Sequence, residues 1–480
     1  MNENYCLGET MGKLKKLRPE RVFYYFEEIC AIPHGSGDTE KISDYCEEFA
    51  KRNNLEYVRE EIGNVIIRKP ATLGKENCPA IILQGHLDMV CEKEANLNFD
   101  FQKDSLNIDI DGDFVFAHGT TLGGDDGIAV AMCLALLEAK DISHPALEVL
   151  FTVDEETGMY GAQALDGSLL SGRRLINIDS EEEGIFTVSC AGGVRAELTL
   201  PIEYEVNKMP CYKVTVEGLI GGHSGVEIHK GRLNSNKVAG AFLSKLNNYR
   251  LISINGGMKD NAIPVFTQMI IATNEDLSFV ADEFVKNTVV ETDPDLKINI
   301  KQCDKCEKCL TAESSEKTAQ FLSTVPNGII KWSDHIENLV ETSLNLGVLK
   351  TKENVVTASF GVRSSVNDDK LKLIKELDAF IRKFGGKMKA EGYYPAWEYC
   401  EESALRDTMC EVYEEITGNA PLVVAIHAGL ECGLLSEKLP GLEAVSIGPN
   451  MFDIHTPRER LSVSSVERVY NYLIKLLEVM

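Results

Sequence analysis

Apolar residues recur with helical spacing in residues 22–29 and 42–49, which predicts two amphipathic helices near the start of the chain. A continuous apolar stretch at residues 128–139 predicts a third, buried helix. Four short apolar segments in the same region are typical of buried strands: 64–68, 80–90, 146–154 and 174–179. Strands that alternate with helices predict an α/β fold, in which helices cover both faces of a mostly parallel sheet.

Between residues 195 and 394 the pattern changes to alternating apolar and polar positions, which is typical of half-buried strands. Five segments show it: RAELTLPI, YKVTVEGL, TQMIIAT, LKINIKQ and NVVTASFGV. Helical stretches interrupt them, which predicts an α+β sheet with helices on one face. The α/β pattern returns after residue 395, with a strand in EAVSIG and a last helix from Ser464, where Ser464 and Glu467 have the spacing of a capping box.

The two patterns predict a discontinuous α/β domain, residues 1–194 and 395–480, into which an α+β domain, residues 195–394, is inserted. A chain of 480 residues fits this division, because single hydrophobic cores usually stop growing at about 250–300 residues. We see no internal repeat that would indicate a solenoid or a propeller.

The charge balance excludes several classes of function. The chain has 75 acidic and 49 basic residues, a net charge of −26, whereas nucleic-acid binders need cations to neutralise phosphates. The longest uncharged apolar run, residues 128–137, is too short for the ~20 residues that span a bilayer. The first residues lack the apolar region of a secretory signal. We therefore expect a cytoplasmic protein with neither a nucleic-acid nor a membrane partner.

The fourteen cysteines are scattered and most lie in apolar contexts, so we expect reduced thiols rather than disulfides. Cys303, Cys306 and Cys309 are the exception, because they form a C-x-x-C-x-x-C run with metal-binding spacing. A structural zinc site and an iron–sulfur cluster each need four ligands, and no fourth candidate lies nearby in the sequence. Both a metal site and a lysine-flanked surface segment with redox-labile thiols stay open.

Candidate catalytic chemistry gathers where the predicted strands end. His86 and Asp88 are two residues apart, so an extended chain places them on one face, where the imidazole can bind a metal that the carboxylate helps to orient. The next strands end in residues 154–156 and Asp179, and residues 125–126 lie in a glycine-rich turn before a helix. In α/β sheets, ligands bind at this edge.

Acids that meet at one edge repel one another unless cations neutralise them, so the cluster predicts two divalent metal ions. His455, before the last helix, is a further ligand candidate. Glu181 to Glu183 fit a solvated loop better than a site. The chain has neither the G-x-S-x-G motif of hydrolases nor H-E-x-x-H, and its glycine-rich turn lacks the nucleotide-binding motifs.

Eight segments in order resemble the aminoacyl-histidine dipeptidases: QGHLDMV, GTTLGGDDGIAVA, FTVDEETGMYGA, NIDSEEEG, GGHSGVEIHKGR, DNAIP, HAGLECG and IHTPRERL. These enzymes are also called Xaa-His dipeptidases, cytosolic non-specific dipeptidases or bacterial carnosinases. They belong to the zinc metallopeptidase family that includes aminoacylase-1, glutamate carboxypeptidase and tripeptidase. The resemblance covers essentially the whole chain.

The resemblance implies an α/β catalytic domain with an inserted lid and dimerisation domain, and two metal ions, Zn²⁺ by preference and Mn²⁺ or Co²⁺ as alternatives. It also implies a role for each residue of the cluster. Asp125 would bridge the ions, His86 and Asp179 would complete one, Glu156 and His455 would complete the other, Glu155 would be the general base for a metal-bridging water, and Asp88 would orient His86. A cis peptide is expected between Asp125 and Asp126, although Asp126 departs from the asparagine frequent in the family.

For the substrate, the resemblance implies a dipeptide, with Xaa-His dipeptides and β-alanyl-histidine included. His223 would stabilise the oxyanion, in its own or the partner subunit of a homodimer, and Asn261 and Arg363 would bind the terminal carboxylate. Without the resemblance, His223 fits a turn residue and Arg363 a surface charge. Two alternatives remain: a related N-acyl-amino-acid deacylase, and a metal-binding or thiol-redox protein that uses the cysteines at 303–309.

Overall fold

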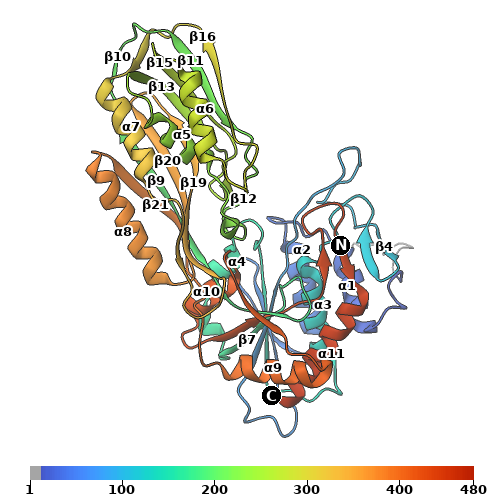
Figure 1. The fold of residues 1–480 in the computed structure, drawn as a ribbon. Helices are drawn as coiled ribbons and strands as arrows, with labels where there is room; N and C mark the ends of the chain where they lie inside the picture. Colours follow the sequence, from blue (N-terminus) through green and yellow to red (C-terminus); the bar gives the residue numbers. More distant parts are fainter. Residues whose placement is uncertain (1–11) are drawn as a thin grey trace. The chain divides into compact units, whose positions relative to one another are not determined.

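The computed structural model describes residues 12–480, so most of the segment in which we expect no signal sequence lies outside the described residues. The chain forms two compact units. The first contains the residues up to Val188 together with Tyr399–Val424 and Leu434–Met480. The second contains Ser189–Glu398 and Ala425–Gly433. Figure 1 shows both units as ribbons coloured along the sequence.

An eight-stranded sheet organises the first unit, in the order β1-β2-β6-β3-β7-β23-β8-β22. The four central strands, β6, β3, β7 and β23, are parallel, and the strands that flank them pair antiparallel. The strands are β1 Glu56–Arg59, β2 Val65–Lys69, β3 Ile81–His86, β6 Leu147–Thr152, β7 Arg174–Asn177, β8 Ile185–Cys190, β22 Leu422–Ile426 and β23 Glu443–Ser446. Every residue of β3 and β6 is buried, as their continuous apolar sequences predict.

The helices around this sheet are α1 Glu20–Cys30, α2 Glu40–Arg52, α3 Gly124–Glu138, α4 Tyr160–Ala164, α9 Ala404–Thr417, α10 Glu431–Lys438 and α11 Val463–Val479. Helix α3 packs against β3 on one side and α1 on the other (Figure 1), and its residues up to Leu137 are all buried. A smaller sheet has the order β24-β25-β5-β4, with β4 Ile108–Asp111, β5 Phe114–Ala117, β24 Met451–Phe452 and β25 Arg460–Ser462.

The second unit is built on an antiparallel sheet in the order β16-β11-β15-β13-β19-β20-β9-β21, with β18 paired to β19. Its strands are β9 Gly192–Pro201, β11 Cys211–Glu217, β13 Tyr249–Gly256, β15 Thr267–Thr273, β16 Lys297–Cys303, β18 Gly328–Trp332, β19 Val340–Thr351, β20 Val355–Ser364 and β21 Lys387–Tyr394. Its helices include α5 Ser235–Leu243, α6 Leu277–Thr288, α7 Ala312–Thr324 and α8 Asn367–Lys383. Two small ladders pair β10 Tyr204–Val206 with β17 Lys308–Leu310, and β12 Gly222–His223 with β14 Ala262–Ile263.

The predicted fold class, a mostly parallel α/β sheet with an α+β insertion, is confirmed. The predicted cap of the last helix is wrong by two residues. Ser462, and not Ser464, accepts the backbone N–H of Ser465 at 3.3 Å, while Ser464 donates its hydroxyl to Asp113. Among the described residues, no helix is long and apolar enough to cross a membrane.

Candidate metal centre

Histidine and carboxylate side chains meet in the first unit, where three parallel strands end at the same edge of the sheet. His86 is the last residue of β3, Glu155 and Glu156 follow β6, and Asp179 follows β7. Asp125 lies at the start of α3, just after the glycine-rich turn. The carboxyl ends of parallel strands are where open α/β sheets bind ligands, so the topology alone gathers these groups.

One half of the centre forms around His86, whose side chain is buried. Its Nε2 atom lies 3.2 Å from Oδ1 of Asp125 and 3.5 Å from Oδ1 of Asp179. The other half forms around His455, whose Nε2 lies 3.1 Å from Oδ2 of Asp125 and 2.9 Å from Oε1 of Glu156. Asp125 therefore directs one carboxylate oxygen to each histidine, which is the placement that a bridging ligand requires.

Three overlapping groups of side chains could each hold a metal ion, because the ligand atoms within each group lie within 4.8 Å of one another. Together the groups contain all five predicted ligands and Glu155. They are His86, Asp125 and Asp179; His86, Glu155 and Glu156; and Asp125, Glu156 and His455. Imidazoles combined with carboxylates suit divalent transition metals such as zinc, so this donor set fits the metal ions that the sequence predicts.

Electrostatics in the cluster also favours cations. Burial raises the pKa of Asp179 to about 7, and the negative charges of Asp125 and Glu156 act in the same direction. Burial alone would lower the pKa of His86, but the carboxylates around it hold that pKa well above its ordinary value. Hydrogen bonds to Asp125 and Glu156 raise the pKa of His455 to about 10. The surplus of negative charge is what bound cations would neutralise.

Asp88 supports the centre through backbone groups as well as through His86. Its Oδ1 atom accepts the backbone N–H of Glu155 at 3.0 Å, and its Oδ2 atom accepts that of Glu156 at 3.3 Å and the hydroxyl of Ser36 at 2.8 Å. Nδ1 of His86 lies 3.5 Å from the carboxylate but only 2.9 Å from the backbone oxygen of Asp88. Asp88 thus contacts both the histidine and the loop that carries the two glutamates.

The expected cis peptide between Asp125 and Asp126 is confirmed. Asp126 is fully buried, and its Oδ2 atom accepts the backbone N–H of His86 at 3.2 Å. Gly85 leaves room for this contact, because a Cβ atom there would lie 2.5 Å from Oδ2 of Asp126 and 2.9 Å from Cβ of Ala129. The glycine before His86 is therefore a steric requirement of the turn.

Glu459 is a residue of this site that sequence analysis missed. Its buried carboxylate accepts four consecutive backbone N–H groups: Leu122 at 2.7 Å and Gly123 at 3.2 Å through Oε2, and Gly124 at 2.7 Å and Asp125 at 3.3 Å through Oε1. Burial raises the pKa of Glu459 to about 7, although the backbone donors oppose the shift. The carboxylate holds the turn that presents Asp125. Only its position four residues after His455 could have drawn attention to it.

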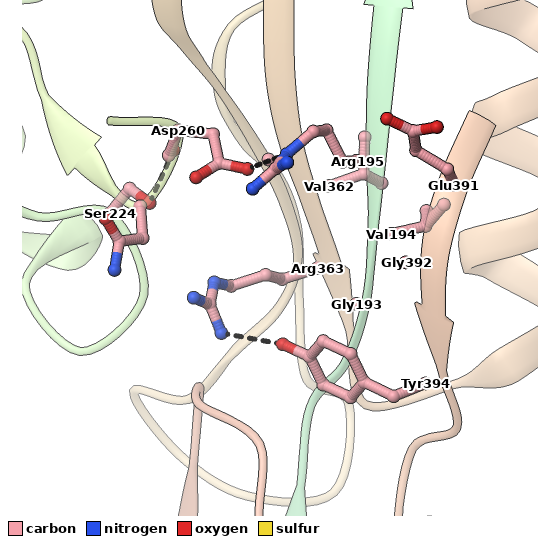
Figure 2. Close-up of a pocket in the computed structure, with 12 residues that line it drawn as sticks. Gly193, Val194, Arg195, Ser224, Asp260, Val362, Arg363, Glu391, Gly392 and Tyr394 are labelled. Atoms are coloured by element: carbon pink, nitrogen blue, oxygen red, sulfur yellow. Dashed lines mark hydrogen bonds and ion pairs between the residues drawn. The ribbon is translucent and has the colours of Figure 1, made fainter. Parts of the chain in front are cut away.

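The predicted substrate-binding residues belong to the second unit. Asn261 and Arg363 line one pocket of about 510 Å³, so the structure brings these two together. In Figure 2, Arg363 and Arg195 extend into the pocket, where Arg363 donates to the Tyr394 hydroxyl at 3.0 Å and Arg195 pairs with Asp260. Two guanidinium groups in one pocket favour an anionic ligand group.

His223, on β12, is half-buried and stands next to Ser224, which lines the same pocket. Its Nδ1 atom accepts the backbone N–H groups of Gly225 and Val226, each at 3.2 Å. Burial and the nearby charge of Arg363 lower the pKa of His223, which favours the neutral ring. A neutral ring whose Nδ1 accepts carries its proton on Nε2, so His223 can donate a hydrogen bond from that atom.

Residues 82–479 match the model of peptidase family M20/M25/M40. Together with the fold and the candidate metal centre, this match shows that the chain belongs to that family and is a hydrolase of peptide bonds. The resemblance found in the sequence is therefore confirmed.

Two relatives are similar over nearly their whole length. The chain is 38% identical to the cytosol non-specific dipeptidase of Escherichia coli over 98% of this chain and 99% of that protein. It is 35% identical to the crystal structure of aminoacylhistidine dipeptidase from Vibrio alginolyticus, with a TM-score of 0.92 and 98% of each chain covered. The aminopeptidase PepT of Bacillus cereus, 15% identical with a TM-score of 0.56 over 96% of this chain and 98% of that one, shares the fold.

Proposed function

We propose that the protein is a two-metal dipeptidase that hydrolyses dipeptides, Xaa-His dipeptides and β-alanyl-histidine among them. One observation carries the proposal: the Asp125 carboxylate lies between His86 and His455, and each histidine contacts a further carboxylate, Asp179 or Glu156. Such a constellation is suited to two adjacent cations. The names of the E. coli and Vibrio relatives, both dipeptidases, support the substrate class.

In this proposal His86, Asp125 and Asp179 hold one divalent ion, and Asp125, Glu156 and His455 hold the other. Zn²⁺ is the expected metal, with Mn²⁺ and Co²⁺ as alternatives, because imidazole and carboxylate donors accept all three. When bound, the ions lower the pKa of water and polarise the scissile carbonyl.

Glu155 acts as the general base: its carboxylate takes a proton from the attacking water and returns it to the leaving amine. Its position supports this role, because its ligand atom lies in the same 4.8 Å group as those of His86 and Glu156. Asp88 accepts the backbone N–H groups of Glu155 and Glu156 and contacts His86, so it keeps the base at a fixed position relative to the ligands.

Arg363 and Asn261 are proposed to bind the terminal carboxylate of the dipeptide. A guanidinium group can offer two parallel N–H donors to a carboxylate, and the Asn261 amide adds a neutral donor in the same pocket. His223 is proposed to donate from Nε2 to the oxyanion of the tetrahedral intermediate. A dipeptide with its terminal carboxylate replaced by an amide should therefore bind more weakly.

The decisive experiment is a substrate panel on protein treated with chelator and then supplied with Zn²⁺, Mn²⁺ or Co²⁺. We expect no turnover without metal, and recovery with Xaa-His dipeptides after metal is restored. N-acetyl amino acids test the deacylase alternative in the same assay. Full activity in metal-free protein, or turnover confined to the N-acetyl substrates, would contradict the proposal.

Replacing Glu155 separates the base from the metal ligands. Glu155→Gln should retain two ions per chain and lose about 10²–10⁴-fold in kcat. Glu182→Gln is the matched control, because Glu182 is an exposed acid near the same edge, and it should leave kcat unchanged. If Glu155→Gln kept wild-type turnover with both ions bound, Glu155 would not be the base.

We further propose a cytoplasmic homodimer that pairs through the inserted domain. Light scattering tests the dimer. Mixing His223→Ala with Glu155→Ala subunits tests whether His223 serves the partner's site: activity recovers in the mixed dimer if it does, and stays absent if it serves its own subunit.

A further inference from the structure

Three cysteines that are close in the sequence and one that is distant from them approach one another in the second unit. The run Cys303, Cys306 and Cys309 supplies three, and the strand pairing supplies the fourth: β11 begins at Cys211, which lies directly opposite Cys303 in the ladder with β16. Directly opposed residues in an antiparallel pair have Cβ atoms about 4.5–5.5 Å apart. We propose that Cys211, Cys303, Cys306 and Cys309 form a tetrathiolate site for a divalent ion, with Zn²⁺ as the expected occupant.

Hydrogen bonds to the Cys211 sulfur support the site. The backbone N–H of Cys306 lies 3.4 Å from this Sγ atom, and Nδ2 of Asn207 lies 3.2 Å from it. The side chains of Cys211 and Cys306 also interact with each other. Both donors can also reach a thiolate, the form in which cysteine binds metal. Burial raises the pKa of the Cys303, Cys306 and Cys309 thiols in the metal-free chain, so a bound ion has to displace their protons.

Asn207 ties the cysteine segments together. Its side-chain amide also donates to the backbone oxygen of Cys306 at 3.1 Å, and its backbone N–H donates to the backbone oxygen of Glu307 at 2.9 Å. The adjoining ladder of β10 and β17 places Cys309 opposite Glu205, two residues before Asn207. Cys211, Cys306 and Cys309 are therefore held by the same short stretch of chain, and Cys303 is held by the ladder of β16 with β11.

Burial separates the four residues into a fixed pair and an accessible pair. Cys211 and Cys309 are each 1% exposed, whereas Cys303 and Cys306 are partly exposed and can receive an ion from solvent. Among the described residues, all groups of three or more ligand atoms within 4.8 Å of one another lie at the His86–His455 centre. The sulfur atoms of the four cysteines are therefore farther apart than a bound ion would hold them. Tetrahedral zinc needs sulfur atoms about 3.8 Å apart, which side-chain rotation at the two exposed cysteines would bring closer.

A divalent ion held by four thiolates would leave two negative charges. Lys213 lowers the pKa of Cys303 and Arg250 lowers that of Cys309, although burial and the nearby carboxylates of Asp304 and Glu205 raise these pKa values more. Ion binding displaces the thiol protons to solvent, so no oxidant or reductant is required. All described cysteines are free thiols, so none of the four is already used in a disulfide and each can bind a metal. The site is independent of the proposed dipeptidase function.

Metal content by mass spectrometry, on protein purified with reductant, tests the proposal. We expect one zinc ion per chain more in the wild type than in Cys211→Ala or Cys306→Ala, whatever the other centre holds. Cys400→Ala is the matched control, because Cys400 is exposed and outside the cluster, and it should keep the zinc content of the wild type. Cys306 is partly exposed, so its variant tests the site even if Cys211→Ala fails to fold.

A second readout separates this site from the first. In protein loaded with Co²⁺, sulfur-to-cobalt charge-transfer absorption should be present in the wild type and in the His86→Ala, Asp125→Ala double variant, and lost in Cys306→Ala. Equal zinc content in the wild type and in Cys306→Ala would overturn the proposal, as would the absence of sulfur-to-cobalt absorption from the Co²⁺-loaded wild type.

Discussion

Three buried carboxylates near the metal centre have the same chemistry and different partners. Asp125 faces two imidazoles, Asp88 accepts two amides of the loop after β6, and Glu459 accepts four amides of the turn before α3. A carboxylate that is saturated by backbone donors cannot also bind an ion strongly. We therefore expect Glu459 to be a positioning residue, which would act on a bound metal through the backbone that carries Asp125.

Replacing Glu459 with glutamine should weaken metal binding. The glutamine NH₂ group is a donor, so it cannot accept the backbone N–H groups that one carboxylate oxygen accepts, and the turn at Asp125 loses half of its anchor. Because Asp125 is proposed to bind both ions, we expect the metal affinity of the centre to fall about 10–100-fold, the usual effect of removing such a support. Chelator competition measures it.

Glu467→Gln is the control, because Glu467 is exposed on α11 and should leave the affinity unchanged. A merely structural role for Glu459 would lower the unfolding free energy and leave the affinity of the folded protein as it is. Excess metal should restore kcat in Glu459→Gln, whereas it should not in Glu155→Gln. Unaltered affinity in Glu459→Gln would contradict the positioning role.

His427 gives the second unit a pH-dependent stability. It is buried, its Nε2 atom lies 2.7 Å from the Ser343 hydroxyl, and burial, with help from the charges of Arg363 and His223, lowers its pKa to about 3. The unfolded chain takes up this proton below about pH 6.5 and the folded chain does not. Stability is therefore fully present above pH 6.5 and is lost as the pH falls toward 3.

His427→Gln should remove this dependence. Between pH 7 and pH 5 the unfolding free energy of the wild type should fall by about 2 kcal/mol more than that of the variant, because each pH unit below 6.5 contributes about 1.4 kcal/mol. Urea denaturation of chelator-treated protein measures the difference, and His229→Gln, at an exposed histidine, is the control. Equal pH dependence in wild type and His427→Gln would show that His427 is protonated in the folded protein.

At the scale of elements, the start of α11 depends on Ser462. Its hydroxyl accepts the backbone N–H of Ser465 and donates to Asp113 at 2.6 Å. Ser462→Ala should therefore lower the unfolding free energy of the first unit by about 0.5–2 kcal/mol. Ser464→Ala and Glu467→Gln should each stay within about 0.5 kcal/mol of wild type, as surface substitutions do. If Glu467→Gln lowered the unfolding free energy more than Ser462→Ala does, the capping box predicted from the sequence would be supported instead.

Periodicity predicted strands whose buried positions are mostly apolar and missed one whose buried positions are often polar. The strands β3 and β6 are buried throughout and mostly apolar, so their apolar runs were sufficient. β19 was not predicted, because its first eight residues are all buried although Glu341, Thr342, Ser343 and Asn345 are polar, so neither an apolar run nor a clean alternation marks it. Burial of polar side chains depends on tertiary contacts, which the sequence pattern does not contain.

At the scale of the whole molecule, sequence motifs predicted the side chains that meet at the candidate metal centre, since each lies at the end of a recognisable strand or next to a helix. They could not identify Glu459, whose hydrogen-bond partners lie more than 330 residues away, or Cys211, which is 95 residues from Cys306. Tertiary pairing leaves no local pattern in the sequence. Both residues follow from the fold, and each adds a contact that the motifs alone do not contain.

The two proposed metal sites belong to different compact units and differ in chemistry, so different ions should stabilise different parts of the chain. Oxygen and imidazole donors accept Mn²⁺, whereas thiolates select softer ions such as Zn²⁺. Hydrogen exchange followed by mass spectrometry measures this. Mn²⁺ at about 100 times its Kd should slow exchange from the globally protected amides of residues 122–137 by about 100-fold and leave residues 205–211 and 301–310 unchanged.

Zn²⁺ should protect all three segments, and Cys306→Ala should lose the protection of residues 205–211 and 301–310 while that of residues 122–137 remains. The reason is mass action: an ion that binds only the folded form of a unit stabilises that unit, and it has no direct effect on a unit to which it does not bind. Equal protection of all three segments by Mn²⁺ and Zn²⁺ would have two explanations: the two units unfold together, or the cysteines also bind Mn²⁺. The Cys306→Ala protein separates them. If the units unfold together, Mn²⁺ still protects residues 205–211 in this variant, and if the cysteines bind Mn²⁺, that protection is lost.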